Sequence, residues 1–379
     1  MKKFHVWDLE RVNIRITKEF LTKINNAILS RFESKENAWR EIFNKNKIPL
    51  STFKNILKQS TQKSFFIPLD IILNICDFFI ISRGELEKSI SAYKTAGGIN
   101  YVELPILPIK ITPVFNMLFA HNIGDGTVIN PKKGRLPYFG YRQFDEFYRI
   151  SYVKKVEEVF GKIKYKHDYF LRSTRPHIPA VLSSLFFRYY NLTIKDFLSE
   201  RARVPDTIFK DGKESLLAVL VAFIIDEGNI DSTQISINLK NEYLIKDLMK
   251  ICKLLNYKSK IVQNRIAPNY WRLNILREGM KRFYEDYLIL NKEYVVIDLG
   301  KKGEKIKNSF KIYARKLYKV KGNEELVLEI LNKEQLSVNQ LAERLAMTRQ
   351  GIRYHIKNLI NQRKIKIIDK NELNWIYGI

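Results

Sequence analysis

Apolar residues recur at helical spacing through much of the first hundred residues, for example Phe20, Ile24 and Ile28. Pro49 and Ser51, the latter as an N-cap, open a further short helix. We therefore predict a helical domain over residues 1–95. The outer face of the short helix is polar and basic without an acid, which indicates a helix-turn-helix that contacts DNA through Thr52, Lys54, Asn55 and Lys58. A plain helical bundle is the alternative.

The pattern alternates between helices and strands over residues 114–300. An apolar helix over 114–123 precedes strands at 127–129 and 138–143, a helix at 147–160, a strand at 162–171 and a helix at 180–190. A second apolar helix starts near Lys213, and the pattern then repeats with a period near 100 residues. The sequence therefore predicts an α+β duplication, with repeat 1 over 114–200 and repeat 2 over 201–300.

The segments around this duplication differ from it in composition. Residues 96–113 contain three prolines within nine positions, which predicts an extended linker. Residues 301–322 carry many lysines and one acid, Glu304, which predicts a basic linker. Residues 323–379 show three helices and a hairpin, the pattern of a winged helix. Its polar face is expected to contact DNA through Arg349, Gln350, Arg353 and Lys357, although such modules also mediate protein contacts.

Composition narrows the class of protein. The chain has 379 residues, 45% of them hydrophobic, which excludes a wholly disordered chain. Only two cysteines occur, Cys76 and Cys252, so a disulfide scaffold or a Cys-ligated zinc module is excluded. No apolar run approaches the roughly 20 residues of a membrane span, so we expect a soluble, cytoplasmic protein, nucleoid-associated in a prokaryote. The net charge of +26 is spread along the whole chain, and this predicts a nucleic-acid partner.

Two apolar helices end in the same way. Leu118–Gly126 and Leu220–Gly228 each finish with an acid followed by glycine, and the acids are Asp125 and Glu227. Small residues one turn apart would let the helices approach closely and bring the acids together. Carboxylates held this close repel one another unless a cation offsets the charge, so we predict a divalent-metal site, with Mg²⁺ the expected ion. Such a metal activates water and stabilises the leaving oxygen of a phosphodiester.

With these helix ends, the sequence over about residues 104–298 resembles the single-chain, two-motif LAGLIDADG endonucleases. The resemblance implies tandem αββαββα repeats with a pseudo-twofold axis at the motif helices, metal binding by Asp125 and Glu227, and saddle-shaped sheets on double-stranded DNA. A single chain would then act as a monomer. His121, Asn122 and Asp226 depart from the family pattern at the helix interface. Basic residues expected on the strands nearest the scissile phosphates are Arg172, Arg175, Lys260 and Arg272.

The resulting prediction is a site-specific, Mg²⁺-dependent double-stranded DNA endonuclease between a helix-turn-helix and a winged helix. No splicing residues frame the central segment, which argues against an intein. The flanking modules leave a second interpretation open: a transcription regulator that binds DNA on the same scaffold without cutting it. A third and weaker alternative is an RNA maturase.

Overall fold

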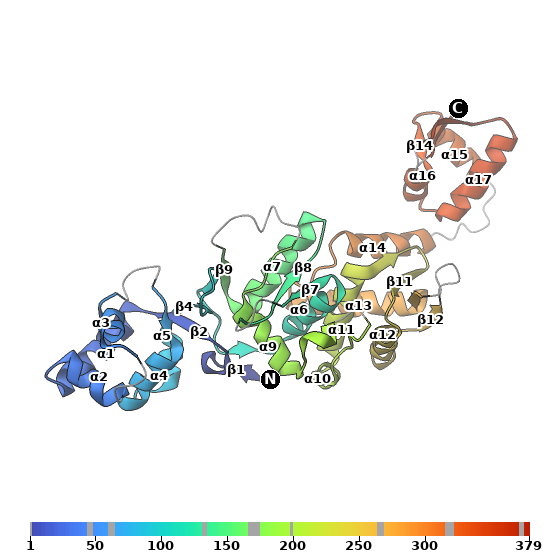
Figure 1. Ribbon diagram of the computed structural model, residues 1–379. Helices are drawn as coiled ribbons and strands as arrows, with labels where there is room; N and C mark the ends of the chain where they lie inside the picture. The colour runs from blue at the N-terminus through green and yellow to red at the C-terminus, as the bar shows by residue number, and fades with distance from the viewer. Residues whose placement is uncertain are drawn as a thin grey trace.

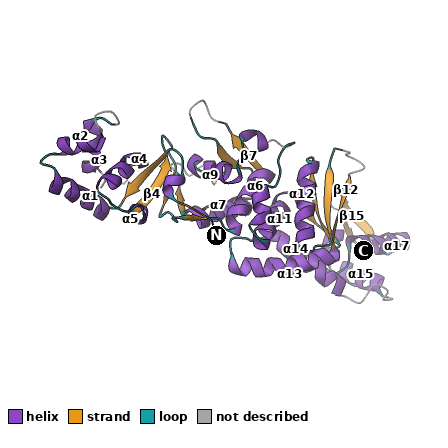
Figure 2. Cartoon of the chain, turned by 90° about the horizontal axis from the view of Figure 1, so that it is seen from below, coloured by secondary structure: helices purple, strands orange, loops and turns teal. Residues whose placement is uncertain are grey.

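The computed structural model describes residues 2–43, 48–59, 65–130, 135–165, 175–197, 200–263, 269–314, 322–370 and 375–379. Within these ranges the chain is a mixed helix and strand protein with several small sheets (Figures 1 and 2). None of its described helices is long and apolar enough to cross a membrane.

The described residues of the N-terminal unit form five α-helices, but the unit is not wholly helical as predicted. The helices are α1 (Lys18–Arg31), α2 (Lys35–Phe43), α3 (Leu50–Gln59), α4 (Leu69–Phe78) and α5 (Arg83–Ser89). Because α3 already begins at Leu50, Ser51 lies in its first turn and is not its N-cap. The short 3-10 helix η1 (Val6–Asp8) lies ahead of α1.

The strands of this unit form a sheet that extends beyond it. The order is β3-β2-β4-β5-β9, with β2 (Val12–Ile16), β3 (Ile67–Pro68), β4 (Ile90–Thr95), β5 (Tyr101–Glu103) and β9 (Lys162–Lys164). A separate pair joins β1 (Lys3–Phe4) to β6 (Ile109–Lys110). Residues 96–113 are extended, as their prolines indicate, but they are not a free linker because β5 and β6 lie within them. Strand partners distant in the chain cannot be assigned from local pattern alone.

The central unit is built on two buried helices, α6 (Pro113–Gly124) and α11 (Lys213–Glu227), which pack against each other. Thr112 caps α6 through its side chain, which accepts a hydrogen bond from the backbone N–H of Phe115, and Pro113 occupies the first turn. Both helices are buried on all sides over most of their length. A helix that is apolar all round is expected in the centre of a core rather than on a surface.

After α11 the chain forms a complete antiparallel sheet with helices on one face. The elements are β10 (Gly228–Ile230), β11 (Gln234–Leu239), α12 (Glu242–Leu254), β12 (Ser259–Gln263), β13 (Trp271–Leu276) and α13 (Arg277–Glu293). The strand order is β10-β11-β13-β12. Ile235, Ile237, Leu273 and Ile275 are fully buried. Because side chains alternate along a strand, the residues between them lie on the face opposite this core.

After α6 the sheet is smaller. The elements are β7 (Gly126–Ile129), β8 (Tyr138–Tyr141), α7 (Glu146–Phe160), β9, α9 (Ala180–Tyr190), the 3-10 helix η2 (Ile194–Phe197) and α10 (Asp206–Lys210). Strand β7 pairs with β8, and a single bridge joins Gly140 to His177. Strand β9 pairs instead with β5 of the N-terminal sheet.

The remaining elements begin with a helix where a linker was predicted. Helix α14 (Lys301–Ala314) contacts α13 and β10, so much of the segment 301–322 is structured. The helix has a buried face that includes Ile306 and Ser309. The count of lysines in this segment, on which the prediction of a linker rested, gave no sign of it. A further unit with its own hydrophobic cluster follows, containing α15 (Asn323–Leu331), β14 (Leu336–Ser337), α16 (Val338–Arg344), α17 (Arg349–Asn361), β15 (Lys366–Lys370) and β16 (Trp375–Gly378).

Candidate catalytic centre and DNA-facing surfaces

Two glycines allow α6 and α11 to turn directly into strands. A Cβ atom added at Gly126 would lie 2.2 Å from the carbonyl oxygen of Asn122, and one at Gly228 would lie 2.4 Å from that of Ile224. No side chain fits at either position. The sequence pattern of acid followed by glycine therefore reflects a backbone requirement, and it fixes Asp125 and Glu227 at the two helix ends.

The helices meet most closely where Gly124 faces Asp226. A Cβ atom at Gly124 would lie 2.8 Å from Oδ2 of Asp226. Gly124 and Asp226 hold equivalent positions, each directly before the acid of its helix. The absence of a side chain in α6 thus makes room for a carboxylate from α11.

Asp125 lies among other negative charges. Burial raises the pKa of Asp125 to about 8, the negative charges of Asp226 and Glu227 add to the rise, and Lys302 and Arg142 oppose it. Gln143 donates a hydrogen bond to the Asp125 carboxylate at 3.0 Å. A carboxyl group whose ionised form is disfavoured by neighbouring carboxylates is a position where a cation would be stabilised.

Glu227 has the same character at the end of α11. Burial raises its pKa, Asp226 raises it further, and Lys302 lowers it. Lys302 of α14 donates hydrogen bonds to the carbonyl oxygens of Ile224 and Ile225, at 2.8 and 2.5 Å. An ammonium group at a helix C-terminus pairs with otherwise unsatisfied carbonyls. The sequence reasoning missed Lys302 because it lay in a segment predicted to be a linker.

The two unusual residues of the helix interface, His121 and Asp226, contact each other. Nδ1 of His121 lies 3.0 Å from Oδ2 of Asp226, and the hydroxyl group of Tyr141 donates to Oδ1 at 2.6 Å. Burial raises the pKa of Asp226 and holds the pKa of His121 well below its usual range. These departures from the family pattern therefore form one polar network.

A second set of polar groups extends this network. Tyr152 donates to the side-chain oxygen of Asn122 at 2.8 Å, so the third departure is also satisfied. Lys155 is almost fully buried, and its ammonium group donates to Ser151 at 2.7 Å. Burial lowers the pKa of Lys155 to about 8, and the negative charge of Asp226 opposes that change. Buried polar groups on this scale must be paired to be tolerated.

The donor atoms fit a hard divalent cation. Asp125 and Glu227 supply carboxylate oxygens from two helix ends, and the pKa of each is raised first by burial and then by neighbouring negative charge. Among the described residues, no three His, Cys, Asp or Glu side chains gather as a complete metal cluster. Mg²⁺ does not require one, because it commonly binds through one or two carboxylates together with water and phosphate oxygens. Asp125 and Glu227 would hold it.

The sheet of residues 228–276 presents a polar face opposite its core. Lys260 is exposed on β12, and Arg272 donates to the side chain of Asn238 at 2.6 Å. Beside them Ser236 donates to Asn274 at 2.9 Å, and both of these side chains are buried in the protein without DNA. Side chains of this kind are suited to base edges and phosphates. The predicted residues Lys260 and Arg272 lie on this face; Asn238, Ser236 and Asn274 were not predicted, although alternation with buried Ile and Leu marks them.

Strand register relates this face to the first half of the central unit. Gly126 pairs with Tyr141 as Gly228 pairs with Ile237, so Tyr138 and Gly140 correspond to Gln234 and Ser236. The bridge from Gly140 to His177 matches the pairing of Ser236 with Asn274, which places Arg175 at the position of Arg272. Arg172 lies outside the described residues.

The residues predicted to contact DNA in the flanking units lie on helix surfaces. On α3, Asn55 and Lys58 are exposed and Thr52 and Lys54 are half-buried, while Phe53, Ile56 and Leu57 form the inner face. On α17, Arg349, Gln350, Arg353 and Lys357 are exposed, and so is Tyr354 beside them. Thr348 caps α17 by accepting a hydrogen bond from the N–H of Gly351 at 3.0 Å. Neither surface carries an acidic residue on its exposed helical face.

Comparison with known proteins gives distant structural similarity. No family model and no curated protein matches the chain. A structure of mesophilic variants of the homing endonuclease I-DmoI is 16% identical, with a TM-score of 0.35, over 46% of this chain and 88% of that one. I-DmoI in complex with DNA and Mn gives 16% identity and a TM-score of 0.33, over 45% and 93%. Full-length DUF199/WhiA from Thermatoga maritima is 17% identical, with a TM-score of 0.29, over 66% of this chain and 90% of that one.

Proposed function

We propose that this protein is a site-specific double-stranded DNA endonuclease of the LAGLIDADG type, dependent on Mg²⁺ or another divalent cation. The observation that carries the proposal is the pair of buried helices α6 and α11. Their ends bring Asp125 and Glu227 so close together that the negative charge of Glu227 helps to raise the pKa of Asp125. The order helix, strand, strand, helix, strand, strand, helix over residues 213–293 supports the αββαββα repeat.

The proposed site holds its substrate through three kinds of surface. The polar sheet face, with Lys260 and Arg272, would contact base edges and phosphates of the cleaved region. Helix α3 would act in a helix-turn-helix, and α17 in a winged helix with β14, β16 and β15 as its sheet. The two halves are covalently joined, so a monomer would cover both half-sites.

The chemistry requires a cation that stabilises charge at the scissile phosphate, and a bound divalent metal supplies this. Asp125 and Glu227 would hold it from the ends of α6 and α11. Lys302 keeps the end of α11 in place through the carbonyls of Ile224 and Ile225. Gln143 holds the Asp125 carboxylate from the side. The surrounding buried network restricts the movement of both helix ends.

The test is cleavage of the protein's own target. Duplexes recovered from a random-sequence pool by binding would be incubated with Mg²⁺ and, separately, with Ca²⁺. We expect cutting at one position in Mg²⁺, and we expect Asp125→Asn and Glu227→Gln each to reduce the cleavage rate by at least about a thousandfold while binding stays within about threefold. Cutting by either variant at the parental rate would refute the site assignment.

A second function is favoured by one feature, the position of Lys302. Its positive charge lowers the pKa of all three carboxyl groups, Asp125, Asp226 and Glu227, against the rise that burial causes. A centre that carries its own cation suits a regulator that binds DNA and does not cut it. Tight, salt-sensitive binding of the selected duplexes with no cutting in Mg²⁺ or Mn²⁺ would establish this alternative and reject the nuclease.

A further inference from the structure

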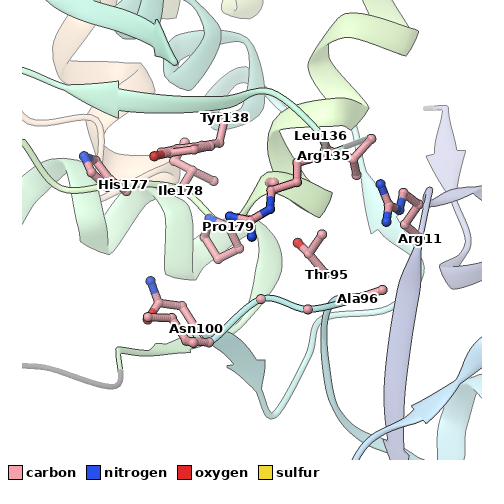
Figure 3. Close-up of a pocket in the computed structure, with 14 residues that line it drawn as sticks. Arg11, Thr95, Ala96, Asn100, Arg135, Leu136, Tyr138, His177, Ile178 and Pro179 are labelled. Atoms are coloured by element: carbon pink, nitrogen blue, oxygen red, sulfur yellow. The ribbon is translucent and has the colours of Figure 1, made fainter. Parts of the chain in front are cut away.

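A cleft of about 650 Å³ lies where the N-terminal unit meets the first half of the central unit. One wall is the turn between β4 and β5, from Thr95 to Asn100, with Arg11 beside it; the other is β8, residues 177–180 and the exposed Arg135 (Figure 3). None of the described residues that line it is acidic. The cleft therefore has a positive lining that the carboxylate centre does not use.

The two walls are held together by specific contacts. The side-chain oxygen of Thr95 accepts a hydrogen bond from the backbone N–H of Val181 at 2.9 Å, which caps the first turn of α9 from a different unit. The backbone N–H of Ala96 donates to the carbonyl oxygen of Arg11 at 2.7 Å. Arg188 of α9 also donates to the carbonyl oxygen of Asp8. The cleft is thus a fixed part of the fold rather than a gap between loosely joined units.

Aromatic and apolar groups lie beside the arginines. The rings of Tyr138 and His177 are 5.4 Å apart between centroids, and Figure 3 shows both side chains on the same side of the cleft. Gly140 makes this possible, because a Cβ atom there would lie 3.0 Å from the His177 ring. Ile178 and Pro179 complete an apolar floor. Arginines and aromatic rings in the lining of one cleft match the two parts of a nucleotide, its phosphate and its base.

The register of the strands connects the cleft to the proposed DNA surface. Tyr138 and His177 occupy the positions held in the second half by Gln234 and Asn274, on the polar sheet face. The cleft therefore begins on that face and ends at the sheet that carries the N-terminal helices. We propose that it binds one strand of the DNA as the strand leaves the central unit, with Arg135 and Arg11 along its phosphate backbone and Tyr138 and His177 against a nucleotide.

This inference rests on the proposed DNA binding and deepens it. A free nucleotide has the same chemistry, so the test must separate the two sources. The probes are a duplex selected on the parent protein, the same duplex shortened at either end, and dAMP and inorganic phosphate as free ligands. The variants are Arg135→Gln and Arg135→Lys. The matched control is Arg282→Gln. Arg282 is an exposed arginine on α13, which packs against the core face of the sheet β10-β11-β13-β12 and not against its polar face.

We expect Arg135→Gln to weaken duplex binding about five- to tenfold and to reduce the salt slope by about one, since one phosphate contact is lost. Hydroxyl-radical protection should disappear at one end of the site only, and shortening the duplex at that end should remove the difference between parent and variant. Arg135→Lys should restore part of the affinity, because it keeps the charge without the planar fork. Arg282→Gln should bind as the parent does.

Three outcomes would overturn the inference, and they differ in what they leave standing. If the parent binds the duplex and Arg135→Gln changes neither affinity, salt slope nor protection, the cleft is not a DNA contact and the proposed function survives. If dAMP binds in the micromolar range, and this binding alone is lost in Arg135→Gln, the cleft takes a free nucleotide. If the parent binds no duplex, the proposed function fails first.

Discussion

The two halves of the central unit begin with the same arrangement of helix and strand, but they differ in how their sheets pair and in the residues at equivalent positions. Both start with a buried helix that ends in an acid and turns into a strand at a glycine. The second half then builds a four-stranded sheet of its own, whereas in the first half β9 pairs with β5 of the N-terminal sheet. At equivalent positions the first half has Gly124 and Gly140, where the second has Asp226 and Ser236.

This comparison shows how a duplicated fold becomes asymmetric. The small residue in one half provides the space for a functional group from the other or from a neighbouring element: Gly124 admits Asp226, and Gly140 admits the ring of His177. In the first half, strand β9 pairs with the N-terminal sheet, and the cleft lined by Arg11 and Arg135 lies where the two units meet. The second half kept the regular polar face. The pairing of the carboxylates therefore depends on both halves, while the surfaces around them have diverged.

The largest effect should follow from filling the space in the first half. Gly124→Ala would place a Cβ atom 2.8 Å from the Asp226 carboxylate, and we expect a loss of about 3 kcal/mol in the free energy of unfolding. Gly84→Ala in α5, where nothing lies within 4 Å, should instead be slightly stabilising, by about 0.5 kcal/mol. Chemical denaturation of both variants measures this. Combining Gly124→Ala with Asp226→Ala should cost less than the sum of the single changes; strict additivity would contradict the contact.

A smaller effect should follow from removing the positive charge of Lys302, which lies on α14, outside both halves of the central unit. Lys302→Gln deprives the carbonyls of Ile224 and Ile225 of a charged donor, so we expect a loss of about 2 kcal/mol by thermal or chemical unfolding. Lys301→Gln next to it removes an exposed pair with Asp145 and should cost less than about 0.5 kcal/mol. Equal losses in the two variants would mean that α14 does not support the end of α11.

The smallest effect is a dependence of stability on pH that arises from the Asp125 carboxyl group. The pKa of Asp125 is raised from 3.8 to about 8, so the folded protein binds more protons than the unfolded chain between these values. Its contribution to stability is present below about pH 4 and is lost as the pH rises through about 8. Relative to Asp125→Asn, the parent should lose roughly 3 °C in melting temperature between pH 6 and pH 9. Mg²⁺ at pH 8.5 should reverse this loss, and parallel melting curves would contradict it.

Much of the secondary structure was accessible from the sequence because it is encoded locally. Helix α9 has the predicted bounds, since its apolar periodicity and flanking residues act within a few positions. Where short strands pair over long distances, as in β2 and β5, the prediction was a helical domain and a linker. Helix α14 was missed because its lysines dominate the composition of a segment whose buried face is narrow.

For the site, the sequence by itself determined which residues stand at the helix ends. An acid followed by an obligatory glycine fixes Asp125 and Glu227 in place, because the backbone geometry at Gly126 and Gly228 excludes any side chain. Only the tertiary structure decided that Asp226 pairs with His121 and Tyr141, and that Lys302 caps the same helix. It also brought Arg135 and Arg11 into the lining of one cleft. Such contacts join residues 77 or more positions apart, and their energies depend on burial and on distances that no local pattern contains.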